Sequence, residues 1–106
     1  MKYPLTQYLN YTVLSLSGEI DLNESPNARL QILSCLNKKN NLLVDLSKVD
    51  YIDSSGVASL VEGLQTARSQ DLIFSLVGVS KSELQVLQLS RLDSVFTIYE
   101  SLDEVN

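Results

Sequence analysis

Histidine and tryptophan are missing from this sequence, and cysteine occurs only once, as Cys35. Without histidine, the chain cannot assemble a Ser-His-Asp or Cys-His catalytic group or a metal site with imidazole ligands. One cysteine excludes an intrachain disulfide and argues against a cysteine-based metal site. We therefore expect no metal and no cofactor, and we expect Cys35 to be a small buried side chain on a helix.

Basic residues are also scarce, since eight Lys and Arg stand against 13 Asp and Glu and the net charge is −5. The eight are scattered along the chain, whereas a nucleic-acid interface normally shows a basic patch. An acidic surface is compatible with docking on a basic protein partner, although it commonly serves solubility alone. No apolar run reaches the length of a membrane span and no signal peptide is visible, so we expect a cytoplasmic protein without membrane insertion.

What the chain does contain is the composition of one ordinary globular domain, with 44% hydrophobic and 20% charged residues among 106. Apolar strands and amphipathic helices alternate along it, which predicts one α/β domain over residues 1–106 with a mostly parallel mixed sheet. The predicted elements, in order, are two strands within 5–17 that end at Gly18, a helix over 25–36, a strand over 42–46, a helix from about 53, a strand over 72–77, a helix over 81–90, a strand over 95–99 and a helix remnant after 101.

Capping residues give two of the helix starts. Ser25, followed by proline, predicts the start of the first helix with Ser25 as its cap. Ser80 and Glu83 have the spacing of a capping box at the third helix. The apolar stripes of the first two helices leave Gln31 and Ser59 outside the predicted core.

The tetrapeptide at 53–56, Asp-Ser-Ser-Gly, stands where a strand gives way to the second helix. Open α/β sheets bind ligands and partners beyond the carboxyl ends of their strands. A phosphoryl group on Ser54 or Ser55 would meet unpaired amides at the helix N-terminus, and it would add about two negative charges beside Asp53. The plain alternative is that one of the two serines merely caps the helix.

These motifs together resemble a known family. The segment LLVDLSKVDYIDSSG at 42–56, followed by an amphipathic helix, resembles the central signature of STAS domains. Upstream, residues 18–21 are similar to the family's G-E-[LI]-D element, and downstream 74–80 and 89–96 resemble its later strand and the loop before its last strand. The resemblance spans nearly the whole chain, although the final helix is shorter here than in many anti-sigma factor antagonists of the family.

Resemblance to the anti-sigma factor antagonists implies a role for each residue of the turn. In those proteins the second hydroxyl residue of D-S-[ST]-G is phosphorylated by a partner kinase, which implies Ser55 as the phosphorylation site and Ser54 as the fallback acceptor. Asp53 would shape the loop and its charge. Asp21 would lie near the serine and contribute to partner contact or to the geometry of phosphotransfer, or would serve only as a turn residue. Gly56 would permit close backbone approach, or would simply favour tight packing.

The same resemblance implies a regulatory protein that is not an enzyme. The unmodified form would bind an anti-sigma factor that is also a serine kinase, phosphorylation of Ser55 would break the complex, and a phosphatase would reset it. Partner contacts are expected from residues exposed on the second helix, such as Val57 and Ser59. A monomer is the default expectation for such a switch.

Two further classes of function remain open. In one, the chain is the STAS subunit of a phospholipid-trafficking ABC transporter and docks on its ATPase, with Ser55 making contacts instead of accepting phosphate. In the other, the chain is an enzyme whose Asp21, Asp45, Asp50 and Asp53 hold Mg²⁺. The sequence offers no phosphate-binding glycine loop to accompany such a metal site.

Overall fold

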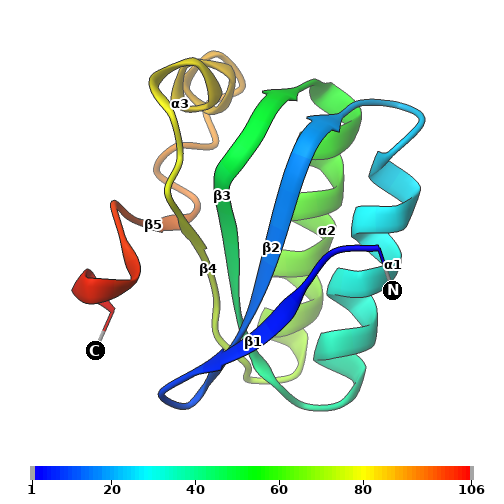
Figure 1. Ribbon diagram of the computed structural model, residues 1–106, viewed down its shortest axis with the longest axis vertical. Coiled ribbons are helices and arrows are strands. Elements are labelled where there is room, and N and C mark those ends of the chain that lie inside the picture. Colours follow the sequence, from blue (N-terminus) through cyan, green and yellow to red (C-terminus); the bar gives the residue numbers. More distant parts are fainter. Residues whose placement is uncertain (1, 106) are drawn as a thin grey trace.

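Five strands form one mixed sheet in the computed structural model, which describes residues 2–105 (Figure 1). The strand order is β1-β2-β3-β4-β5; β1 is antiparallel to β2 and the other neighbours are parallel. The predicted α/β domain with a mostly parallel mixed sheet is therefore confirmed. The strands are β1 (Leu5–Tyr8), β2 (Tyr11–Ile20), β3 (Asn41–Ile52), β4 (Phe74–Val77) and β5 (Thr97–Tyr99).

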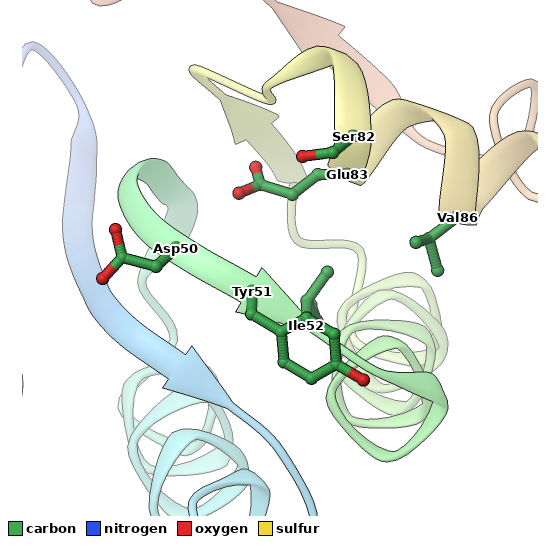
Figure 2. A pocket seen from close by; sticks show the side chains of 6 residues that line it. All are labelled: Asp50, Tyr51, Ile52, Ser82, Glu83 and Val86. Carbon is green, nitrogen blue, oxygen red and sulfur yellow. The ribbon is translucent and has the colours of Figure 1, made fainter.

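Within residues 2–105, three α-helices and a short 3₁₀ turn accompany the sheet. Figure 1 shows α1 (Ser25–Asn37) and α2 (Ser54–Ser69) side by side along one face of the sheet. The third helix, α3 (Lys81–Leu89), lies near the carboxyl end of β3, and side chains of both elements gather there (Figure 2). The 3₁₀ turn η1 (Leu102–Glu104) follows β5.

The apolar residues of β3 explain why this strand occupies the middle of the sheet. Leu42 and Val44 belong to the main core beneath α1 and α2, whereas Leu43 packs on the opposite face with Val13 and Val105. Leu42, Leu43 and Val44 are all completely buried. A strand covered on both faces reads as a continuous apolar run, because successive side chains point to opposite faces.

Two strands extend beyond their predicted ends. β2 continues through Gly18 to Ile20, and β3 continues through 47–52. Gly18 adopts a φ of +74° in a segment where the register between β2 and β3 shifts, so the chain makes a bulge and pairing then resumes. As a result, Ile20 pairs with Ile52 and the two strands end at the same level.

The start of α1 differs from the prediction that Ser25 is its cap. Glu24 is the N-cap residue and its side chain makes no capping hydrogen bond, while Ser25 is the first helical residue and is buried. The capping box of α3 is confirmed, because Glu83 N donates to Ser80 Oγ (3.1 Å) and Ser80 N donates to Glu83 Oε1 (3.1 Å). Cys35 is buried on α1, as expected.

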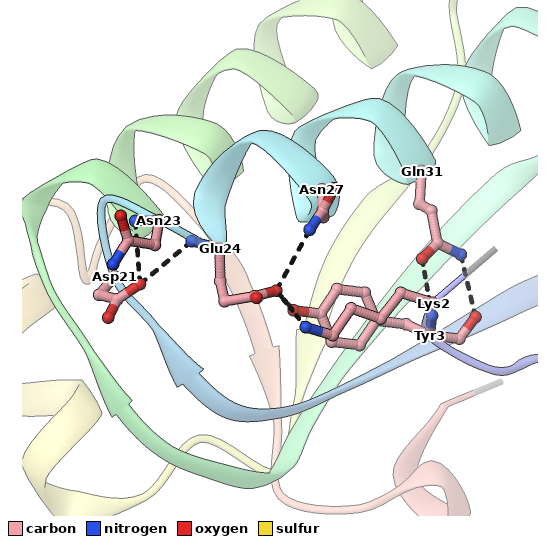
Figure 3. Close-up of polar contacts among 7 residues, drawn as sticks. All are labelled: Lys2, Tyr3, Asp21, Asn23, Glu24, Asn27 and Gln31. Carbon is pink, nitrogen blue, oxygen red and sulfur yellow. Dashed lines mark hydrogen bonds and ion pairs between the residues drawn. The ribbon is translucent and has the colours of Figure 1, made fainter.

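Gln31 was expected outside the core, and that expectation is wrong. Only 3% of the residue is exposed. Its Oε1 accepts a hydrogen bond from Tyr3 N (2.7 Å), and its Nε2 donates to Tyr3 O (2.9 Å; Figure 3). The amide thus clamps the N-terminal segment against α1, and the main-chain groups of Tyr3 account for a buried polar side chain on this helix.

Candidate functional site

The carboxyl ends of β2 and β3 bring together two segments that are distant in sequence. Ile20 and Ile52 are paired, so Asp21 and Asp53 leave neighbouring strands at the same edge of the sheet. Asp53 N also donates a hydrogen bond to Ile20 O (3.4 Å). The acidic residue of the G-E-I-D segment and the start of the Asp-Ser-Ser-Gly turn therefore belong to one site.

Asp53 caps α2. Its Oδ1 accepts hydrogen bonds from Ser55 N (2.9 Å) and Gly56 N (3.2 Å), which are two of the amides that a helix N-terminus leaves without helical partners. The alternative that Ser54 or Ser55 caps the helix is wrong. Amides expected to be free for a phosphate are thus already bonded to Asp53.

The hydroxyl of Ser55 is bonded to the same carboxylate. Ser55 Oγ donates to Asp53 Oδ1 at 2.5 Å, and Ser55 is half-buried, whereas Ser54 is exposed. This hydroxyl is the largest cause that holds the pKa of Asp53 below its usual value; the amides of Gly56, Ser55 and Leu22 act in the same direction. Asp53 is therefore kept ionised and pointed at the hydroxyl of Ser55.

Gly56 lies where no larger residue fits without movement. A Cβ at this position would stand 2.6 Å from Ile20 O and 2.6 Å from Ile52 Cγ1. The structure thus favours the reading in which Gly56 permits close backbone approach. This contact lets the first turn of α2 sit directly against the ends of β2 and β3.

Asp21 holds the turn that leads into α1. Its Oδ1 accepts hydrogen bonds from Asn23 N (3.0 Å) and Glu24 N (3.1 Å), as Figure 3 shows. Next to it, the Glu24 carboxylate pairs with Lys2 Nζ (2.6 Å) and accepts from the hydroxyl of Tyr3 (3.0 Å). Asp21 has a clear role as a turn residue, and its contact with a partner stays a prediction.

A groove of about 520 Å³ runs along α2 beside the turn. Ser54 opens it, Val57 and Val61 contribute apolar walls, and Ser90 and Leu92 close it from the loop after α3. Ser90 and Leu92 could not be assigned to the site from the sequence, because only the tertiary fold brings this loop against α2.

Exposed apolar side chains lie close to the groove and the turn. Leu22 lies two residues after the end of β2, Leu89 directly precedes the groove residue Ser90, and the two residues are 74% and 86% exposed. Scattered exposed apolar residues are ordinary, but two of them near one turn and groove are compatible with a surface that another protein covers.

A comparison with protein-family models identifies the family of this chain. The STAS domain model matches residues 2–105. This chain belongs to the STAS domain family. The resemblance seen in the sequence motifs is therefore confirmed over nearly the entire chain.

Solved structures with the STAS fold include anti-sigma factor antagonists. A candidate anti-sigma factor antagonist from Thermotoga maritima is 26% identical, with 96% of this chain and 89% of that chain covered and a TM-score of 0.89. An anti-sigma factor antagonist from Mycobacterium paratuberculosis is 25% identical, with 97% and 88% covered and a TM-score of 0.83. The phosphorylated form of the Bacillus cell fate determinant SpoIIAA is 19% identical, with 96% and 94% covered and a TM-score of 0.74, and shares the fold.

Two residues of this STAS domain are less exposed than the sequence suggested. Val57 and Ser59 were expected on the surface of α2, but they are only 5% and 6% exposed. Ser59 Oγ makes hydrogen bonds to Ser25 O (3.3 Å) and Ser55 O (3.2 Å), so it links α1 to the first turn of α2. Val57 can reach a partner only through the groove that it lines.

The remaining expectations for the STAS domain concern metals and membranes. Within residues 2–105, no three His, Cys, Asp or Glu side chains gather as a metal site would require, so a Mg²⁺ enzyme built on Asp21, Asp45, Asp50 and Asp53 has no support there. In the same part of the chain, no helix is long and apolar enough to span a bilayer.

Proposed function

We propose that this STAS domain is a phospho-switch of the anti-sigma factor antagonist type, with Ser55 as the phosphate acceptor. The observation that supports it is the 2.5 Å hydrogen bond from Ser55 Oγ to Asp53 Oδ1 at the carboxyl edge of the sheet. The hydroxyl is half-buried but belongs to the first turn of a helix, where an added anion is tolerated. The similarity to anti-sigma factor antagonists supports the same class of partner.

In the proposed reaction, the partner is an anti-sigma factor that is also a serine kinase and holds ATP. Ser55 Oγ bonds to the γ-phosphorus, the bond from that phosphorus to its bridging oxygen breaks, and ADP leaves. The hydroxyl proton passes to Asp53 Oδ1, which already accepts a hydrogen bond from that hydroxyl. The STAS domain itself acts as the substrate and binding partner of the kinase, and a phosphatase returns it to the unmodified form.

Phosphorylation would change the surface by competing with Asp53. Oδ1 of Asp53 accepts from the hydroxyl and amide of Ser55 and from the amide of Gly56. A phosphate on Ser55 removes the hydroxyl donor and can accept hydrogen bonds from the same two amides. It also adds about two negative charges next to the Asp53 carboxylate. Repulsion would drive Asp53 from the cap, which alters the turn that the kinase contacts.

The unmodified protein would dock through the groove along α2. Its apolar walls, Val57, Val61 and Leu92, lie next to the exposed Ser54 and the switch residue Ser55. A phosphate at its rim would have to be desolvated by a bound partner, which weakens binding. Modification and docking would thus be coupled because they use one edge of the molecule.

The test is phosphopeptide mapping of protein recovered from growing cells, with identification of the proteins that co-purify. We expect phosphate on Ser55, and an anti-sigma factor with the unmodified form only. Ser55→Ala should abolish the phosphate and keep the partner, Ser55→Asp should lose the partner, and the control Ser54→Ala should leave the phosphate on Ser55. An unmodified Ser55 under all growth conditions, with an ABC transporter ATPase as the partner, would replace this proposal by the transporter-subunit function.

A further inference from the structure

A second cavity lies between β3 and α3, separate from the groove along α2. It has a volume of about 160 Å³, and Figure 2 shows the side chains around it. One wall comes from the end of β3 and the other from the first turns of α3. The lining residues are Asp50, Tyr51, Ile52, Ser82, Glu83 and Val86.

Glu83 is the unusual member of this lining. Only 3% of the residue is exposed. Its Oε1 accepts the amide of Ser80 (3.1 Å) in the capping box, but its buried Oε2 has no hydrogen-bond partner within residues 2–105. A buried carboxyl oxygen without a partner is costly, and in native proteins such an atom calls for an explanation.

The surroundings of Glu83 disfavour its ionised form, which a neighbouring positive charge would stabilise. Burial is the main cause that raises the pKa of Glu83, and the negative charge of Asp50 adds to the effect. Two carboxylates thus line one cavity, and a cation between them would relieve both the unmet oxygen and their repulsion. The terminal torsion of a glutamate is soft, so a small rotation would turn Oε2 toward such a cation while it bends the hydrogen bond from Ser80 N to Oε1.

The shape of the cavity selects the kind of cation. Ile52 and Val86 make part of its wall apolar, which suits an aliphatic stem that carries its charge at the tip. Oε1 of Glu83 is occupied by Ser80, so Glu83 offers one oxygen only. A lysine ammonium acts as a point charge and needs one oxygen from each carboxylate, whereas arginine binds best to two oxygens of one carboxylate.

We propose that this cavity receives a lysine side chain of a protein partner that docks at the carboxyl edge of the sheet. The stem lies against Ile52 and Val86, and the ammonium group bridges Glu83 Oε2 and the carboxylate of Asp50. The cavity directly precedes Asp53 along β3, so one partner can reach both places. The inference rests on the proposed function only in that a protein docks at this edge.

The experiment uses n-butylammonium as a probe for the lysine side chain, followed by NMR of the methyl groups of Ile52 and Val86. Butylguanidinium represents arginine, and n-butanol supplies the same chain without charge. We expect saturable shifts with butylammonium, weaker binding of butylguanidinium and no saturation with butanol. Glu83→Gln, which keeps the capping-box acceptor, should weaken butylammonium binding about tenfold.

Glu19→Gln is the matched control, because it removes the same charge from an exposed site outside the cavity. It should leave butylammonium binding unchanged. The proposal is overturned by equal binding to wild type and Glu83→Gln, by saturation with butanol, or by no saturable shift in the wild type. Stronger binding of Mg²⁺ or of butylguanidinium at the same methyl groups would also overturn it. The probe requires neither phosphate nor partner, so a negative result leaves the phospho-switch to its own test.

Discussion

Asp53 and Glu83 both serve the first turn of a helix, yet their surroundings move their pKa values in opposite directions. Asp53 accepts three hydrogen bonds on Oδ1, which stabilise its ionised form and lower its pKa. Glu83 is buried with one oxygen unmet, which disfavours its ionised form and raises its pKa. The ionised form of Asp53 is therefore already stabilised in the free protein. Glu83 would gain most from a bound cation.

This contrast predicts opposite effects of pH on two variants. Because the folded-state pKa of Asp53 is lowered, its contribution to stability is present above the unfolded value of about 3.9 and is lost as pH falls through the folded value. Asp53→Asn should therefore be less stable than wild type near neutral pH, with a difference that shrinks in acid. Urea unfolding at several pH values between about 3 and about 7 measures it.

The raised pKa of Glu83 reverses the sign. Its contribution is fully present below the unfolded value of about 4.3 and is lost as pH rises through the folded value. In the same unfolding series, Glu83→Gln should gain stability relative to wild type as pH increases. A parallel response of the Asp53 and Glu83 variants would show that their surroundings do not differ as described.

At the scale of elements, the N-terminal segment is attached to α1 through Gln31. Gln31→Ala removes two hydrogen bonds and leaves N and O of Tyr3 without their partner. We expect a loss of about 1–3 kcal/mol in the free energy of unfolding and faster hydrogen exchange at the Tyr3 amide. Gln85→Ala, at an exposed position of α3, is the control and should change neither. Unchanged exchange at Tyr3 would mean that the segment is held by other contacts.

The types of the elements and their order could be predicted, because the spacing of apolar residues along the sequence indicates which side chains are buried. The apolar run at 42–46, interrupted once by Asp45, is typical of a strand covered on both faces, and Leu42 and Leu43 pack on opposite sides of the sheet. The ends of elements could not be predicted, because they depend on pairing. Gly18 signalled a strand end, yet pairing with β3 carries β2 through a bulge to Ile20.

The candidate site was only partly predictable for a related reason. The turn at 53–56 was found because cap-type residues and a glycine follow a buried strand. Its hydrogen bonds were not foreseen, since Asp53, Ser54 and Ser55 are all acceptable caps and only the backbone geometry selects Asp53. The groove wall at Leu92 and the cavity wall at Glu83 depend on how separate segments pack, which local patterns do not report.

At the scale of the whole molecule, the net charge of −5 should steer the domain toward a basic partner. The association rate constant with the co-purified partner should fall as salt rises from about 0.1 M to about 1 M, because the Debye length shrinks from about 10 Å to about 3 Å. The dissociation rate should change less. Stopped-flow or surface-binding kinetics measure both. An association rate constant that does not change with salt concentration would indicate that apolar contact in the groove governs the encounter, without electrostatic steering.

The strand order β1-β2-β3-β4-β5 repeats the order of the chain itself. Each strand that leaves the ribosome therefore finds its neighbour already present, and no late segment must be threaded between earlier ones. Pairing between strands that follow one another in sequence closes shorter loops than pairing between distant strands, and its entropic cost is lower. The residues that bond within the turn at Ser55 all precede β4 in the chain, whereas the cavity at Glu83 also needs α3. A nascent chain would therefore contain every residue of its proposed phosphate-acceptor turn before those of its proposed lysine pocket.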